Sequence, residues 1–150
     1  MKKIIFGIIT IFIMLLLTGC GNRKALTNNE FSEILGLEGF AITDVTALME
    51  DENIEVLAAA NNNNYQLEYH IYKTTAAAKK AYEGNKKSFE TYKKGNNKEK
   101  FLSGNNYDKY TLELSDEYKV VSRIDNTLVY ASINLEYKKD LNIILDKLGY

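Results

Sequence analysis

The sequence predicts an α+β fold, an antiparallel sheet of five or six strands with helices packed on one face. Two β-prone runs, 54–60 and 65–72, are joined by an asparagine tract, and three more follow between residues 109 and 134 across short turns. Helical patterns stand before, between and after these groups of strands. Strands that follow one another across hairpins, rather than alternating with helices, favour this class. The expected order is helix, two or three strands, helix, three strands, helix.

The first element is a short helix over about residues 28–36. Thr27 and Glu30 fit a capping box, in which the two side chains satisfy free main-chain N–H groups at the helix start. Apolar residues follow at helical spacing, and Gly36 offers a stop. Residues 40–45 then form a candidate first strand.

The clearest hairpin joins the runs 54–60 and 65–72. Asparagine tolerates a left-handed backbone, so the four asparagines at 61–64 suit the connection. Along the second strand the side chains alternate between two faces. The expected core face carries Tyr65, Leu67, Tyr69 and Ile71, and the other face carries Gln66, Glu68, His70 and Tyr72.

A long helix is expected from Thr74 or Thr75 to about Lys94, where Gly95 ends it. It contains a repeat of seven residues, nearly two helical turns, so lysine pairs recur along one side and aromatic residues along another. The paired lysines are Lys79, Lys80, Lys86, Lys87, Lys93 and Lys94.

The last third of the chain predicts a meander and a final helix. Residues 95–106 are expected to form a polar loop. Strands at 109–114, 118–124 and 127–134 follow, since only short polar turns separate them. Apolar residues between 137 and 148 recur at helical spacing and predict an amphipathic C-terminal helix.

The first twenty residues form a secretory signal pattern rather than part of the fold. Two lysines precede an apolar run, residues 4–17, whose length is about fourteen residues against the roughly twenty that a helix needs to cross a bilayer core. The small residues Thr18 and Gly19 follow and leave room for a processing enzyme. Cys20, the only cysteine of the chain, comes directly after them.

The motif Leu17-Thr18-Gly19-Cys20 resembles the lipobox of bacterial lipoproteins. The resemblance implies that a diacylglyceryl group is attached to the Cys20 thiol and that the mature protein is anchored by this lipid to the extracytoplasmic face of the cell membrane. In overall plan only, the mature part resembles small Gram-positive lipoproteins of unknown role. The expected division is a signal peptide at 1–19, the lipidated cysteine and a short linker at 20–27, and a single α+β domain at 28–150.

Length and charge limit the function further. About 130 residues remain after cleavage, enough for one domain with its own core. Since the only cysteine is committed to lipid, no disulfide can form within the chain. The 19 basic residues include the two lysines of the signal, so the mature chain has 17 against 20 acidic residues, a net charge of −3. This balance argues against a nucleic-acid partner.

Residues that suit catalysis are few. The chain has no Gly-x-Ser-x-Gly pattern, no second histidine and no free cysteine, so no catalytic residue, no cofactor and no enzymatic activity are expected. Glu68 and His70 project from the same face of one strand and are weak candidates for metal ligands. Because nothing supplies further ligands, no metal site is expected, and an exposed pair on a wet face is the simpler interpretation.

The lysine pairs of the long helix are candidate contacts for an anionic surface. Between Lys79 and Lys100 eight lysines stand against three glutamates. Each lysine near an anionic membrane contributes about 1 kcal/mol. The alternative interpretation is an ordinary solvated helix, with Glu83–Lys87 and Glu90–Lys94 as ion pairs at i,i+4 spacing.

The sequence therefore predicts a lipid-anchored extracytoplasmic lipoprotein that serves as a non-enzymatic binding or interaction module at the cell envelope. Its expected partners are the membrane, through Cys20, and another envelope protein or an anionic surface. The alternative is a small-molecule or metal-binding lipoprotein that delivers its ligand to a membrane partner. A concave pocket with convergent polar groups would favour this alternative, and an exposed patch or charged face would favour an interaction module. Tyr72, Tyr107 and Tyr150 are the tyrosines expected to be free for a partner.

Overall fold

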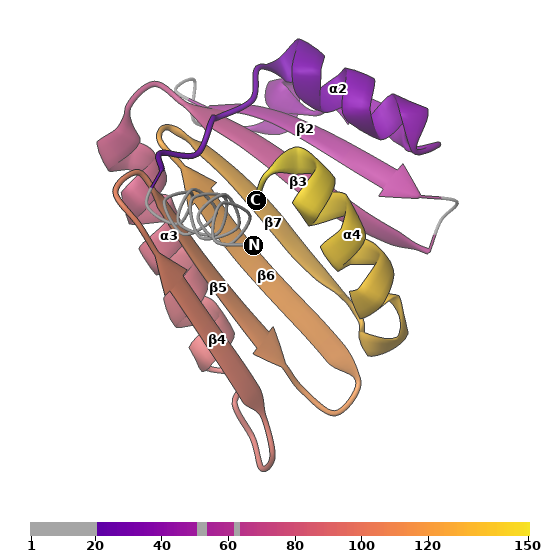
Figure 1. The fold of residues 1–150 in the computed structure, drawn as a ribbon, viewed down its shortest axis with the longest axis vertical. Coiled ribbons are helices and arrows are strands. Elements are labelled where there is room, and N and C mark those ends of the chain that lie inside the picture. The colour runs from indigo at the N-terminus through magenta and orange to yellow at the C-terminus, as the bar shows by residue number, and fades with distance from the viewer. Residues whose placement is uncertain (1–20, 51–53, 62–63) are drawn as a thin grey trace, which may run out of the picture.

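The computed structural model describes residues 21–50, 54–61 and 64–150, which form a seven-stranded antiparallel sheet with three α-helices (Figure 1). The signal pattern, the lipobox and Cys20 lie outside these residues. The α-helices are α2 (Asn28–Leu37), α3 (Thr75–Glu90) and α4 (Lys138–Leu148), and η2 (Thr46–Leu48) and η3 (Leu135–Tyr137) are single 3₁₀ turns. The strands are β1 (Ala41–Asp44), β2 (Ile54–Asn61), β3 (Tyr65–Tyr72), β4 (Lys98–Ser103), β5 (Tyr107–Glu113), β6 (Glu117–Ile124) and β7 (Thr127–Asn134).

Two meanders make up the sheet, whose strand order is β1-β2-β3-β7-β6-β5-β4. The first meander contains β1 to β3 and the second contains β4 to β7, and every neighbouring pair is antiparallel. The two meanders meet where β3 pairs with β7, with Tyr69 opposite Val129. Because α3 lies between β3 and β4 in the chain, it connects the centre of the sheet to its far edge.

The predicted α+β class and antiparallel sheet are confirmed. The sheet has one strand more than the six expected, because residues 98–103, expected to lie in a polar loop, form the edge strand β4. All six side chains of β4 are exposed, so no apolar alternation marks this strand in the sequence. In the described part of the chain the order is helix, three strands, helix, four strands, helix.

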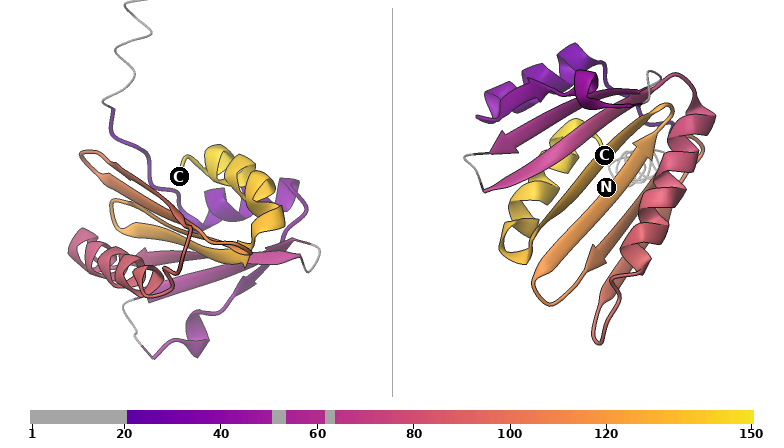
Figure 2. Two further views of the ribbon diagram at one scale, coloured as in Figure 1. Left: turned by 90° about the horizontal axis from the view of Figure 1, so that it is seen from below. Right: turned by 180° about the vertical axis from the view of Figure 1, so that it is seen from behind.

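Helices cover both faces of the sheet, not one face as expected (Figure 2). α2 and α4 pack on one face, and α3 packs on the other. The central strands β6 and β7 are apolar on both sides: Val120 and Val129 belong to the α2–α4 core, and Val121 and Leu128 belong to the α3 core. A sheet that is apolar on both faces needs a cover on each.

Tyrosine fills much of the core beneath α2 and α4. Tyr69 is fully buried and stacks on Phe31, with ring centroids 4.4 Å apart. Tyr150 is also buried, and its hydroxyl is hydrogen-bonded to the hydroxyls of Tyr69, at 3.4 Å, and Thr127. The expectation that Tyr72 and Tyr150 are free for a partner is therefore wrong, since they are 7% and 2% exposed.

Helix starts agree with the predicted caps, but one helix is shorter than expected. The capping box of Thr27 and Glu30 is present at the start of α2, and the Thr74 side chain caps α3. α3 ends at Glu90 rather than near Lys94, so the last lysine pair follows the helix.

Candidate functional site

The chain is fixed to the domain from Arg23 onward. The main-chain N–H of Arg23 donates to Oδ1 of Asn106 at 2.9 Å, and Nδ2 of Asn106 donates to the Arg23 carbonyl oxygen at 2.7 Å. Leu26 packs against the core, and its carbonyl oxygen accepts a hydrogen bond from the Tyr69 hydroxyl at 2.5 Å. Most of the expected linker is thus part of the domain. Only three residue steps separate Cys20 from Arg23, about 10 Å at full extension.

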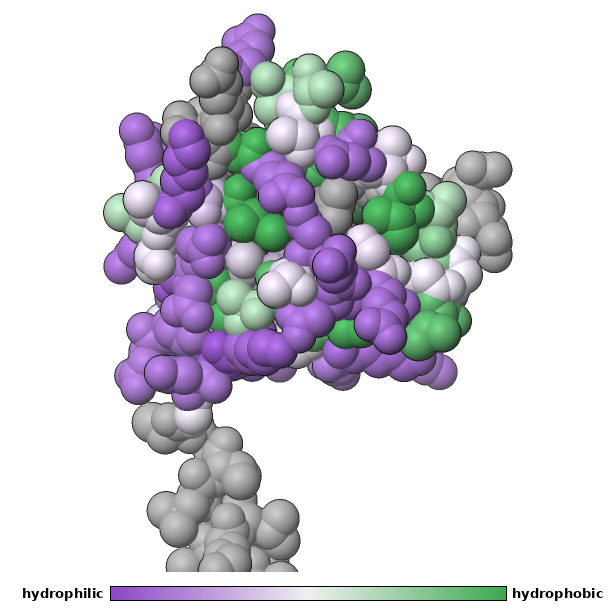
Figure 3. All heavy atoms as spheres, turned by 90° about the horizontal axis from the view of Figure 1, so that it is seen from above, coloured by the Kyte–Doolittle hydropathy of each residue, from purple (hydrophilic) through white to green (hydrophobic). Residues whose placement is uncertain are grey.

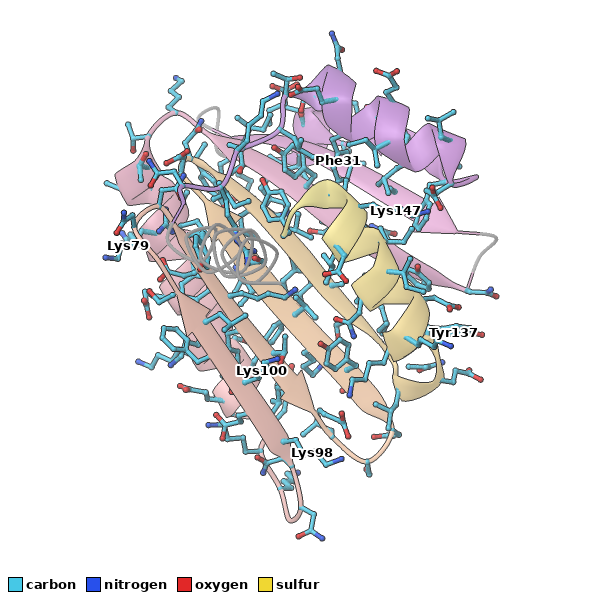
Figure 4. The ribbon with its side chains drawn as sticks, in the orientation of Figure 1. Phe31, Lys79, Lys98, Lys100, Tyr137 and Lys147 are labelled. Carbon is cyan, nitrogen blue, oxygen red and sulfur yellow. The ribbon has the colours of Figure 1, made fainter. Side chains whose placement is uncertain are left out.

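A cleft of about 570 Å³ lies beside Arg23, between the β4–β5 hairpin and α4. Ligand pockets in proteins commonly have volumes of about 300 to 1,000 Å³, so this volume suits a small molecule. Figure 4 places Lys98 and Lys100 along β4, on the edge strand that forms one wall. In the space-filling view from above, the surface around the start of the described chain is mainly hydrophilic (Figure 3).

The two strands of the hairpin give the cleft three successive levels. Each strand presents every second residue to one side of the sheet. The register places these residues in three opposite pairs: Lys98 with Glu113, Lys100 with Thr111, and Leu102 with Lys109.

Helix α4, on the opposite wall of the cleft, also presents three successive side chains to it. Lys138, Asn142 and Asp146 recur every four residues along α4, so they lie on one helix face, and all three line the cleft. The Tyr118 hydroxyl donates to Oδ1 of Asn142 at 3.2 Å. The middle of the cleft therefore offers the neutral hydrogen-bonding groups Thr111 and Asn142 beside Lys100, and its two ends offer charged groups.

One end of the cleft is closed by ion pairs around Glu113. This carboxylate pairs with Lys98 of β4 at 2.8 Å and with Lys138 of α4. It therefore links the two walls. Lys138 and Lys98 lower the pKa of Glu113 through these contacts.

The other end of the cleft holds the basic side chains of Arg23, Lys100 and Lys109. The Arg23 guanidinium lies over the Tyr107 ring, 4.0 Å from its centroid. Nζ of Lys109 donates to the main-chain oxygen of Tyr150 at 3.0 Å. Within the described residues, no side-chain carboxylate forms an ion pair with Arg23, Lys100 or Lys109.

A turn at Gly149 orients this end. Gly149 has φ 81°, a left-handed conformation that favours glycine, and it terminates α4. The chain then folds back, so that the N–H of Tyr150 donates to the Leu145 carbonyl oxygen at 2.9 Å. The carbonyl oxygen of Gly149 accepts a hydrogen bond from the Arg23 guanidinium at 3.3 Å, and the main-chain oxygen of Tyr150 accepts the one from Lys109. One turn thus positions both basic side chains.

Burial lowers the pKa of Lys109 below that of an exposed lysine. The charge of Asp146 opposes this effect, and the charges of Arg23 and Lys100 add to it. A desolvated ammonium group near other cations is stabilised by a bound anion. This end of the cleft is therefore better suited to an anion than to a neutral group.

Glu68 and His70, the weak metal candidates, lie on the α3 side of the sheet, away from the cleft. Nε2 of His70 is 2.9 Å from Oε2 of Glu68, and its Nδ1 is 3.3 Å from the Tyr72 hydroxyl. The His70 side chain is 16% exposed and that of Glu68 is 37% exposed, so the pair is only partly exposed to solvent. No group of three or more His, Cys, Asp or Glu side chains that could hold a metal ion occurs among the described residues.

The paired lysines of the α3 region are separated from the cleft by the sheet. Figure 4 places Lys79 at the outer edge of the molecule, apart from Lys98 and Lys100. Lys86 and Lys93 are half-buried, and both lie near Glu90, at 2.8 Å and 3.8 Å. The exposed members are Lys79, Lys80, Lys87 and Lys94. Their contact with an anionic surface stays a prediction.

The cleft residues were missed because they come from separate segments. Arg23 lies in the expected linker, Lys100 in the expected loop, and Lys109 and Lys138 in two further elements. One signal was available in the sequence: Lys98 and Lys100 alternate with other residues just before a glycine-containing turn and another lysine-bearing strand. That pattern indicates a hairpin with lysines on one face.

Comparisons with known proteins add no assignment. No protein-family model matches the chain, and no significant match was found among curated proteins or among solved structures. In the part of the chain that the structure describes, no helix is both long enough and apolar enough to cross a bilayer.

Proposed function

We propose that the protein is a lipid-anchored extracytoplasmic lipoprotein that binds a small molecule in the cleft between β4, β5 and α4. The observation that carries this proposal is the cleft, whose volume falls within the range of small-molecule sites and whose walls bring polar side chains together. The cleft favours a small-molecule-binding lipoprotein over an interaction module with an exposed patch or charged face. The proposed role is binding, with no catalytic residue and no metal.

The anchor is proposed from the lipobox and fits the position of the cleft. Arg23 lines the cleft and follows Cys20 by three residues. A lipid on Cys20 would therefore hold the cleft within about 10 Å of the membrane surface. Two acyl chains give stable anchoring where one is marginal. The membrane is thus the proposed partner, and the ligand is bound close to its surface.

Anchoring is tested by growing bacteria that express the full-length chain with labelled palmitate. The wild-type protein is expected to carry the label and to sediment with membranes. The Cys20→Ala variant is expected to carry none, because the thiol that accepts the lipid is gone. Label on Cys20→Ala would contradict lipidation at this residue.

Binding in the cleft is tested by a thermal-shift screen of the lipidated protein in detergent. A ligand that binds only the folded state raises the melting temperature. Asn142→Trp fills the middle of the cleft and is expected to abolish such shifts. Ile143→Trp is the matched control, since Ile143 is exposed on the same helix. A ligand that stabilises both variants equally would place the site elsewhere.

A further inference from the structure

We propose that the Arg23 end of the cleft binds a phosphate group of the ligand, with Arg23, Lys100 and Lys109 as the contacts. This inference rests on the proposed function, because it names the chemical class of the molecule that the cleft takes. Three observations support it: the distribution of charge, the convergence of three cations, and the chemistry of the groups around them.

The cleft is positively charged although the mature chain is acidic. Five basic and three acidic side chains line it, a net charge of +2, whereas the mature chain has a net charge of −3. The basic residues are Arg23, Lys98, Lys100, Lys109 and Lys138, and the acidic residues are Glu99, Glu113 and Asp146. Lys98 and Lys138 share Glu113, which leaves +1 at that end. Arg23, Lys100 and Lys109 stand against Asp146, which leaves +2 at the opposite end, and Glu99 is paired with Lys93.

Three cations converge there from separate segments. Lys109 lies opposite Leu102, and Lys100 is two residues from Leu102 along β4, which corresponds to about 7 Å along the strand. This distance lets two flexible lysine side chains reach one group. Arg23 approaches from the N-terminal segment and is held by Tyr107 and by the Asn106 hydrogen bonds. The cations are therefore gathered before any ligand binds.

The chemistry of these groups favours phosphate. An arginine fork can donate two parallel hydrogen bonds to phosphate oxygens, and lysines add point charges. A phosphate ester offers up to two negative charges and several oxygens, so it matches three cations better than a single carboxylate does. Thr111 and Asn142 at the middle level then face the remainder of the ligand with neutral polar groups.

Such a phosphate can belong to a soluble ester or to the headgroup of an anionic phospholipid. The proximity of Arg23 to the anchoring residue makes both sources accessible. Their shared chemistry is a glycerol phosphate group. The test therefore compares glycerol phosphate with dihexanoyl phosphatidylglycerol, a short-chain lipid that carries a glycerol-linked phosphodiester.

The experiment is calorimetric titration of the full lipidated protein in dodecyl maltoside, a phosphate-free detergent. Wild type is expected to bind glycerol phosphate, the short-chain lipid, or both. Arg23→Gln, Lys100→Gln and Lys109→Met are each expected to weaken binding about tenfold or more, as for loss of a charged hydrogen bond. Lys79→Gln, an equal charge change on α3, is expected to leave affinity unchanged. Circular dichroism melts of each variant separate loss of binding from loss of folding.

The outcomes are distinct. Tighter binding of the lipid identifies a headgroup as the source, and equal or tighter binding of glycerol phosphate identifies a soluble ester; either result supports the inference. Binding of succinate or a neutral sugar that Asn142→Trp abolishes, without phosphate binding, overturns the inference but leaves the proposed function intact. Equal weakening by Lys79→Gln overturns the inference as non-specific charge attraction. No binding of any probe or screened ligand overturns both.

Discussion

Arg23 and Asn106, 83 residues apart in the chain, are joined by two hydrogen bonds that run in opposite directions. The Asn106 side chain also donates to Oδ2 of Asp125 at 3.0 Å, and its main-chain oxygen accepts from the Asp125 N–H at 2.8 Å. One asparagine thus ties the N-terminal segment, the β4–β5 turn and the β6–β7 turn together. This arrangement fixes one wall of the cleft with respect to the N-terminal segment.

We expect Asn106→Ala to destabilise the protein by about 1–2 kcal/mol, because it leaves partly buried main-chain groups without partners. It should also release the segment before α2, so the Arg23 amide should exchange with solvent faster. Denaturant titration gives the first quantity and hydrogen-exchange mass spectrometry the second.

The control for Asn106 is Asn96→Ala, which removes an exposed asparagine from the turn before β4. Its stability and exchange are expected to match wild type. If Arg23 stayed equally protected in Asn106→Ala, the segment would be held by its other contacts, and the role assigned to Asn106 would be wrong.

Two glycine-to-alanine substitutions are expected to act in opposite directions. A Cβ at Gly104 would lie 2.2 Å from a ring atom of Tyr107, so Gly104→Ala must displace the ring on which Arg23 stacks. Such overpacking costs about 1–3 kcal/mol. Gly84 lies within α3 with nothing within 4 Å of a Cβ, so Gly84→Ala should stabilise by about 0.5–1 kcal/mol. Thermal melts of both variants measure the contrast, and equal effects would refute it.

Most of the fold could be predicted because its elements carry local signals. The capping box at Thr27, the asparagine tract between β2 and β3 and the alternation along β3 each specify an element within a few residues. The packing of α3 on the second face of the sheet was not predicted, because polar residues interrupt the apolar pattern on that face of β6. Lys119 and Arg123 in β6 are buried, and Arg123 is paired with Asp108 at 2.7 Å. Sequence alternation does not reveal that a charge is buried with its partner.

The cleft could not be predicted for a different reason. Its walls belong to an edge strand without apolar alternation and to a helix distant in the sequence. The lysines of the α3 region were more conspicuous because they recur in pairs along one stretch. Arg23 and Lys109 become neighbours only through the strand register and the turn at Gly149. Long-range pairing of this kind leaves no periodic trace.

We expect Glu113→Gln to strengthen phosphate binding several-fold. The change raises the net charge of the cleft from +2 to +3 and frees Lys98 and Lys138 from their shared carboxylate. The gain should shrink in high salt, which screens such interactions. Calorimetric titration with glycerol phosphate at low and high salt measures both effects. Glu117→Gln, an equal charge change beside Lys119 away from the cleft, is the control, and an equal gain there would contradict a local effect.

Lys109→Met is expected to make the protein more stable while weakening phosphate binding about tenfold or more. Burial, modified by Asp146, Arg23 and Lys100, lowers the Lys109 pKa below the ordinary value of 10.5, so the unfolded state binds more protons between the two pKa values. Below the pKa of Lys109 in the folded state, the buried charge lowers the free energy of unfolding by its full amount. As the pH rises from that pKa to the pKa in the unfolded state, the lysine loses its proton in the folded protein and the free energy of unfolding rises. Methionine removes the buried charge, so the free energy of unfolding of the variant should exceed that of wild type at neutral pH, and the difference should shrink as the pH rises toward 10.5. Denaturant titrations of both proteins across the alkaline range measure this difference, and a variant less stable than wild type at neutral pH would show that Lys109 stabilises the fold.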